Sequence, residues 1–238
     1  MNSSERTAGK VLPLPTKTRY SGEAQTTGSA RPTGALLRDT YRLLGATLAF
    51  SALIAASSAA LQLPHPGLLL TLAGYFGLLF AVTKFRESGW GLVAVFALTG
   101  FMGYTLGPIL NLYLTLGNGP ELVTLSVGAT ALVFFILSAY ARRDDAIDAT
   151  RWGAFLTVGI ITAFCLGLAA IFMQIPALSL AVSGMFVLLM SGLIVYQTQA
   201  ILNGGENNVI MATVTLYVSL YNLFVSFLQL FGFFGGEE

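Results

Sequence analysis

The sequence predicts an all-α integral membrane protein with seven transmembrane helices. Hydrophobic residues make up 55% of the 238-residue chain and charged residues only 10%, a composition that argues against a soluble protein. Several long stretches contain no Asp, Glu, Lys or Arg, namely 43–83, 88–120, 122–141, 152–205 and 207–236. A charge in the middle of a bilayer costs on the order of 2.5–3.5 kcal/mol, so these stretches indicate membrane-buried chain.

The number of helices follows from the turns that the longer stretches must contain, because a spanning helix needs about 20 apolar residues. LPHPG (63–67) divides the first stretch and QIPA (174–177) divides the fourth. The predicted helices therefore cover residues 42–62, 67–83, 90–116, 121–141, 152–173, 177–202 and 208–234. The apolar runs do not alternate with period two, which excludes a transmembrane β-barrel.

The basic residues predict how the helices are oriented. Seven of the 12 Lys and Arg residues precede or open the first helix, and the others follow the second or the fourth helix. With seven helices, all 12 fall on the side of the amino terminus. By the positive-inside rule we expect the amino terminus in the cytoplasm and the carboxyl terminus outside, in the periplasm of a bacterium.

The amino-terminal segment differs in composition from the rest of the chain. Residues 1–35 are rich in Ser, Thr, Gly and Pro and contain no apolar run. We expect a disordered cytoplasmic tail there, followed by a seven-helix transmembrane domain over residues 36–238. No signal peptide is predicted, and the first helix would act as an uncleaved signal. A mitochondrial presequence is the alternative interpretation of the tail.

Several intramembrane activities require residues that the predicted spans lack. A retinal photoreceptor needs a lysine in the middle of a helix, but Lys10, Lys17 and Lys84 all lie outside the spans. The one histidine, His65, lies in a loop, and neither G-x-S-x-G nor H-E-x-x-H occurs. We therefore predict that the protein is not an enzyme, and we expect no catalytic residue, metal, cofactor or nucleic-acid partner.

Uncharged polar residues are the remaining candidates for a site inside the membrane. On the last predicted helix they recur at steps of four and three, which places them on one helix face: Thr215, Ser219, Asn222, Ser226 and Gln229. Further candidates are Tyr104, Asn111 and Tyr113 on helix three and Gln197 and Thr198 on helix six. Two interpretations are open, namely interhelical hydrogen bonds worth about 0.6–2 kcal/mol each or the lining of a gated, partly hydrated cavity.

Helix three also carries a packing signal. Gly103 and Gly107 form a G-x-x-x-G motif, and small residues let helix backbones approach closely in a membrane. Pro108 follows directly and should kink or break the helix. These three residues are candidates for a hinge, with static packing as the alternative role.

Five longer segments carry a family resemblance. They are TYRLLGATLAFSA, LPHPGLLLTLAGYFGLLF, TGFMGYTLGPILNLYL, GATALVFFILSAY and NGGENNVIMATVTLYVSLYNLFVSFLQLFGF. Together they resemble the Bax inhibitor-1 family, and within it the bacterial YccA-like branch, from about residue 36 to the end of the chain. The resemblance implies six helices around a central seventh and a location in the bacterial inner (plasma) membrane.

The same resemblance implies two functions. Members of the YccA-like branch are similar to slow substrates of FtsH, a membrane AAA+ protease, and moderate its attack on other membrane proteins. Members of the wider family are associated with a pH-sensitive calcium leak through an aspartate pair on helices six and seven. Gln197 and Ser219 occupy those two positions in this sequence. Neither side chain titrates or supplies the negative charge that calcium prefers, so the resemblance favours a regulator that binds an FtsH-type protease.

Overall fold

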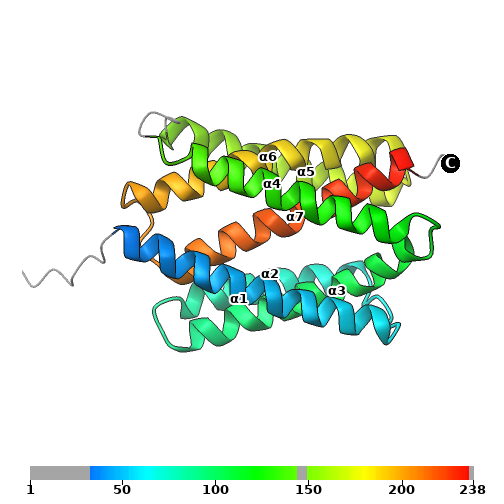
Figure 1. Cartoon of the computed structure of the whole chain (residues 1–238), viewed down its shortest axis with the longest axis horizontal. Coiled ribbons are helices and arrows are strands. Elements are labelled where there is room, and N and C mark those ends of the chain that lie inside the picture. Colours follow the sequence, from blue (N-terminus) through cyan, green and yellow to red (C-terminus); the bar gives the residue numbers. More distant parts are fainter. Residues whose placement is uncertain (1–32, 144–148, 236–238) are drawn as a thin grey trace, which may run out of the picture. The chain divides into compact units, whose positions relative to one another are not determined.

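The computed structural model describes residues 33–143 and 149–235, and all regular secondary structure in this part of the chain is helical. The helices are α1 (Thr33–Ala60), α2 (Leu68–Phe85), α3 (Trp90–Leu114), α4 (Gly119–Tyr140), α5 (Ala149–Met173), α6 (Pro176–Leu202) and α7 (Val209–Gly235) (Figure 1). All seven are long and apolar enough to cross a membrane. The predicted fold class is thereby confirmed, whereas most of the predicted tail, residues 1–32, lies outside the described residues.

The first helix begins earlier than predicted, at Thr33 in place of residue 42. Its first turns carry Arg38 and Asp39, an exposed pair whose side chains approach to 3.8 Å. Charge-free stretches mark the part of a helix that lipid surrounds. The backbone hydrogen bonds of a helix do not depend on that boundary, so α1 continues beyond it.

Pro108 does not break α3. The helix runs from Trp90 to Leu114 with Pro108 inside it, so the predicted break is absent. A proline removes one backbone donor from the helix ladder. In a membrane, packing against neighbouring helices can compensate for that loss.

The last helix is the central one, as the resemblance implied. α7 runs obliquely between α1, α2 and α3 on one side and α4, α5 and α6 on the other (Figure 1). It packs against α1, α2, α3, α4 and α6, whereas α5 packs on α6. Within an apolar stretch of 18 residues, 50% of the residues of α7 are buried inside the protein, whereas the corresponding share for α2 is 6%. The polar residues of α7 therefore belong to a helix that faces protein over much of its length.

The two ends of the bundle differ in charge. Lys84, Arg86, Arg142 and Arg143 lie in or beside the loops after α2 and α4, at the end of the bundle where α1 and α7 begin. We call this the basic end. The opposite end, where α3 and α7 finish and α6 begins, has no Lys or Arg in its described loops. We call it the far end.

Candidate functional site

The polar row of α7 consists of the five residues predicted from the sequence, Thr215, Ser219, Asn222, Ser226 and Gln229. The first three each donate a hydrogen bond to the backbone carbonyl four residues earlier in α7, at 3.0, 2.8 and 2.8 Å. Each of these side chains therefore makes a hydrogen bond within its own helix. Interhelical bonding, one of the two interpretations of this row, does not describe these three residues.

Gln229, at the far end of the row, does bond to another helix. Its amide nitrogen donates to the Ser179 hydroxyl, and its carbonyl oxygen accepts from the Ser183 hydroxyl. Both serines belong to α6. Gln229 therefore joins the end of α7 to the beginning of α6.

Gln197 and Ser219, which occupy the positions of the family's acidic pair, are both buried. The Ser219 hydroxyl donates to its own helix, and the Gln197 amide nitrogen has no partner among the described residues. No hydrogen bond joins the two side chains. The two residues at the positions of the acidic pair therefore do not interact through a hydrogen bond.

The buried side-chain atoms that have no hydrogen-bond partner in the described part of the chain all belong to residues near the basic end of the bundle. They are the side-chain oxygen or nitrogen atoms of Thr40, Tyr41, Ser138, Gln197 and Thr198. These residues come from α1, α4 and α6 and lie between half a turn and about two turns from the helix ends at the basic end. Buried polar groups usually have a partner. These atoms, which we call the unpaired group, could therefore each bond to water or to another neutral hydrogen-bonding molecule, and none of them belongs to a carboxylate that could hold a metal ion.

Tyr217 is a buried polar residue of α7 that was not predicted as a site residue from the sequence. Only 1% of its surface is exposed. Its hydroxyl lies 2.6 Å from the Ser51 hydroxyl of α1 and donates to the Thr99 carbonyl of α3 at 3.3 Å. One turn earlier, the Thr213 hydroxyl lies 3.5 Å from the Thr40 carbonyl. Thr213 and Tyr217 form a second polar row, spaced by four residues, that joins α7 to α1 and α3.

Gly103 and Gly107 of α3 lie against α1. A Cβ atom at Gly103 would lie 2.5 Å from the Ser51 carbonyl oxygen, and one at Gly107 would collide with the Ser58 side chain. Asn111, a predicted cavity residue, donates from its amide to the Ala59 carbonyl of α1 at 2.9 Å. These residues hold α1 and α3 together, which supports a packing role for them.

A set of hydrogen bonds joins two loops at the basic end, and it was not predicted from the sequence either. Asn208 caps α7 by accepting from the backbone N–H groups of Ile210 and Met211. Its amide donates to the Arg86 carbonyl at 3.0 Å. The Glu206 carboxylate accepts from the Asn208 backbone N–H at 2.8 Å. The NGGENN segment therefore links the α6–α7 and α2–α3 loops.

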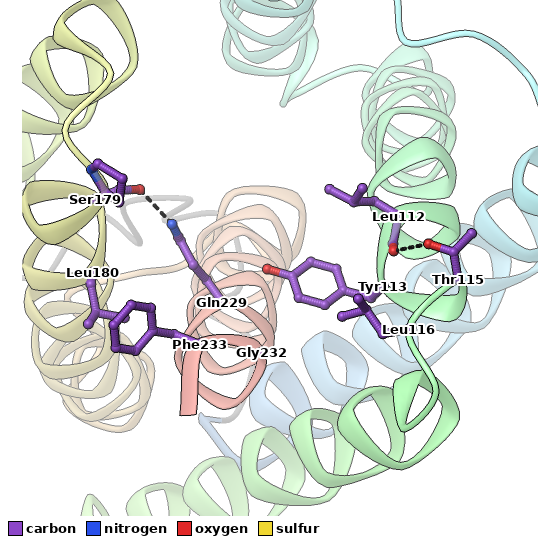
Figure 2. Close-up of a pocket in the computed structure, with 10 residues that line it drawn as sticks. Leu112, Tyr113, Thr115, Leu116, Ser179, Leu180, Gln229, Gly232 and Phe233 are labelled. Atoms are coloured by element: carbon purple, nitrogen blue, oxygen red, sulfur yellow. Dashed lines mark hydrogen bonds between the residues drawn. The ribbon is translucent and has the colours of Figure 1, made fainter. Parts of the chain in front are cut away.

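A pocket of about 500 Å³ opens at the far end of the bundle. Figure 2 shows α7 as its floor and side chains of α3 and α6 as its walls. Its lining consists of Leu112, Tyr113, Thr115, Leu116, Pro176, Ser179, Leu180, Gln229, Gly232 and Phe233. We call it the far-end pocket. Of the predicted site residues, only Gln229 and Tyr113 reach it.

The polar candidates thus do not form one site. Asn111 and the glycines lie at the α1–α3 contact, Gln197 belongs to the unpaired group, and Gln229 lies in the far-end pocket. In the described part of the chain, no group of three His, Cys, Asp or Glu side chains could hold a metal ion. The chemistry available to these sites is hydrogen bonding by neutral groups.

Comparison with known proteins identifies the family. The family described as "Inhibitor of apoptosis-promoting Bax1" matches residues 33–236. An uncharacterized protein of Pseudomonas aeruginosa is 51% identical over 208 residues, which are 87% of this chain and 93% of the relative. The "Modulator of FtsH protease YccA" of Escherichia coli is 50% identical over 198 residues, which are 83% of this chain and 90% of that protein.

Two further relatives are described as membrane proteins. An "uncharacterized membrane protein" of Vibrio cholerae is 36% identical over 207 residues, or 87% of this chain and 92% of the relative. A second Escherichia coli relative, 50% identical over 198 residues, is named "Inner membrane protein YccA". Together with the seven apolar helices, these matches identify a multi-pass protein of the bacterial inner membrane. The chain belongs to the Bax inhibitor-1 family.

Proposed function

We propose that this chain is an inner-membrane regulator that binds an FtsH-type membrane AAA+ protease and moderates its attack on other membrane proteins. It would act as a competitor that the protease degrades slowly. The observation that carries the proposal is the 50% identity, over 83% of the chain, to a protein named as a modulator of FtsH. No catalytic step belongs to this role, so the proposal requires no active site.

The packing of α1 supports a role as a slow substrate. A protease that pulls on the amino-terminal segment would extract α1 first, because α1 is the first helix of the chain. α1 contacts Gly103 and Gly107 of α3, and its Ser51 hydroxyl bonds to Tyr217 of the central helix. Removing α1 would break these contacts together, which should raise the barrier to extraction.

The proposal also requires the amino-terminal segment to face the protease. We infer a cytoplasmic amino terminus from the position of the basic residues at one end of the bundle. Residues 1–32 would then serve as the segment that the protease engages. Fusing a reporter that is active only in the cytoplasm to the amino terminus tests the orientation, and reporter activity there is the expected result.

The half-life of an unrelated FtsH membrane substrate tests the regulator directly. We expect a longer half-life when this protein is overproduced, with a matched seven-helix membrane protein of another family as the control. Deleting residues 1–30 should weaken the effect while the bundle still accumulates in the membrane. An unchanged substrate half-life would refute regulation by occupancy of the protease.

An ion-leak pathway is the second candidate, and one observation favours it. Gln197 and Thr198 are buried and have unpaired polar atoms near the basic end, where water could enter the bundle. Flux through proteoliposomes tests this candidate, with the double variant Gln197→Leu and Asn222→Leu as the comparison. Flux that the double variant reduces and the tail deletion leaves unchanged would rank the leak above the regulator.

A further inference from the structure

The far-end pocket lies where two helices leave a gap over the central one. α3 and α6 do not pack against each other, and both pack on α7. Leu112 and Tyr113 belong to the last turn of α3, Leu180 to the first turns of α6 and Phe233 to the last turn of α7. The pocket therefore lies within a few turns of the helix ends, so it faces one of the two leaflets of the bilayer.

The rim of the pocket is continuous with the apolar surface that faces the bilayer. Leu112 is 69% exposed, Phe233 48% and Leu116 41%. In a membrane-spanning protein, exposed apolar side chains at this depth contact lipid. The occupant most available to the pocket is therefore a lipid of the surrounding leaflet.

The chemistry of the lining is amphipathic and uncharged. Among residues 33–143 and 149–235, no Asp, Glu, Lys or Arg lines the pocket. Ser179 and Gln229 bond to each other, and the Thr115 hydroxyl donates to the Leu112 carbonyl at 2.7 Å. The Tyr113 hydroxyl has no hydrogen-bond partner among the described residues and points across the pocket toward Gln229 (Figure 2). One hydroxyl thus remains available to a ligand, beside walls of Leu and Phe.

Gly232 explains why the Tyr113 ring can lie in this position. A Cβ atom at residue 232 would collide with the Tyr113 ring. The absence of a side chain on α7 lets the ring pack over the helix and directs its hydroxyl into the pocket (Figure 2). The hydroxyl therefore lies in a packed environment, which favours a defined bonding geometry.

We propose that the far-end pocket binds a glycerophospholipid of the surrounding leaflet. One acyl chain lies along Leu112, Leu180 and Phe233, and an ester carbonyl oxygen accepts a hydrogen bond from the Tyr113 hydroxyl. The volume of about 500 Å³ lies within the range of about 300–1,000 Å³ typical of small-molecule sites. The uncharged lining selects for the glycerol-ester region that phospholipids share, and not for an anionic headgroup. This inference is independent of the proposed protease partner.

Photocrosslinking of the full chain in nanodiscs tests the site. The nanodiscs contain phosphatidylethanolamine and phosphatidylglycerol with a trace of phosphatidylethanolamine that carries a diazirine on one acyl chain. Mass spectrometry of the crosslinked peptides locates the label. We expect labelling of residues 112–116 and 229–233 to exceed, several-fold, the labelling around Leu188, an equally apolar residue of α6 that is 76% exposed and outside the pocket.

Three variants sharpen the test. Leu112→Trp should fill the pocket and reduce its labelling several-fold, whereas Leu188→Trp should leave it unchanged. Tyr113→Phe keeps the ring and removes the hydroxyl, so it should reduce the labelling without altering the circular dichroism spectrum or the gel-filtration profile. Excess unlabelled phosphatidylethanolamine and phosphatidylglycerol should compete equally well, because the lining carries no charge.

Four results would overturn the proposal. The first is labelling that follows side-chain exposure evenly over the bundle. The second is pocket labelling that persists in Leu112→Trp or in Tyr113→Phe. The third is a crosslink from the pocket to a second copy of the chain in place of lipid, and the fourth is a strong preference for the anionic competitor.

Discussion

The two polar rows of α7 use their hydrogen bonds differently. Thr215, Ser219 and Asn222 of the polar row donate to carbonyls of α7 itself. Tyr217 and Thr213 of the second row reach α1 and α3. Both rows are polar, and both belong to the same central helix. Of these five residues, only the two of the second row depend for their bonds on where neighbouring helices lie.

The difference shows that a polar residue in a membrane helix need not join helices. A hydroxyl or amide that bonds to the preceding turn is satisfied before any neighbour arrives. A hydroxyl that reaches another helix is satisfied only when that helix packs at the right distance. We therefore expect substitutions along the second row and its α1–α3 support to affect stability more than substitutions along the polar row.

Gly103→Leu should have the largest effect, because it removes the close approach that supports the second row. A Cβ atom there would meet the Ser51 carbonyl oxygen, a backbone atom that cannot rotate away. We expect the free energy of unfolding to fall by about 3 kcal/mol or more. Thermal unfolding in detergent, followed by circular dichroism, measures the change.

Gly128→Leu is the matched control for this substitution. Gly128 lies in α4, is exposed, and has no atom within 4 Å of a Cβ built on it. It should leave the unfolding temperature nearly unchanged. Equal losses in the two glycine variants would contradict the role assigned to the α1–α3 contact.

Tyr217→Phe should have the next largest effect. It leaves the ring in place and deprives the buried Ser51 hydroxyl of its partner at 2.6 Å. We expect a loss of about 2 kcal/mol, since an unsatisfied buried polar group costs about 1–3 kcal/mol. A double-mutant cycle with Ser51→Ala measures the coupling free energy between the two hydroxyls. Tyr140→Phe, at an exposed position, is the control. Additive losses in the cycle would mean that the two hydroxyls do not interact.

Gln229→Leu should have a smaller effect and sharpens the comparison within the polar row itself. Gln229 is the member of that row that bonds to another helix, through Ser179 and Ser183. We expect a loss of about 1 kcal/mol, within the range of interhelical hydrogen bonds in membranes. A double-mutant cycle with Ser183→Ala should show a coupling free energy between the two side chains. If the two losses are additive, the bond between Gln229 and α6 does not contribute to stability.

Thr215→Val should have the smallest effect. The side chain keeps its shape, and the lost hydrogen bond is one that α7 makes to itself. We expect a change below about 0.5 kcal/mol. Thr124→Val in α4 is the control, because the Thr124 hydroxyl also donates to the carbonyl four residues earlier. A loss larger than that of Tyr217→Phe would reverse the proposed order of the two rows.

The order of these effects could not be predicted from the sequence. The step of four and three placed Thr215, Ser219 and Asn222 correctly on one helix face, but it does not say whether a side chain turns outward or back to its own helix. Tyr217 does not stand out in the sequence, because its ring is large and its one hydroxyl contributes little to the pattern. Asn208 was missed for a related reason, since its partners lie in the α2–α3 loop, far away in the sequence.

The sequence by itself determined the number of helices and their approximate limits. Long charge-free stretches must form hydrogen-bonded helices in lipid, and prolines and loops divide them. The tertiary structure alone decided which polar groups meet. The partners of Tyr217 come from α1 and α3, and the far-end pocket exists because α3 and α6 both pack on α7 but not on each other. Helix formation depends on local residues and the solvent, whereas such contacts depend on how whole helices pack.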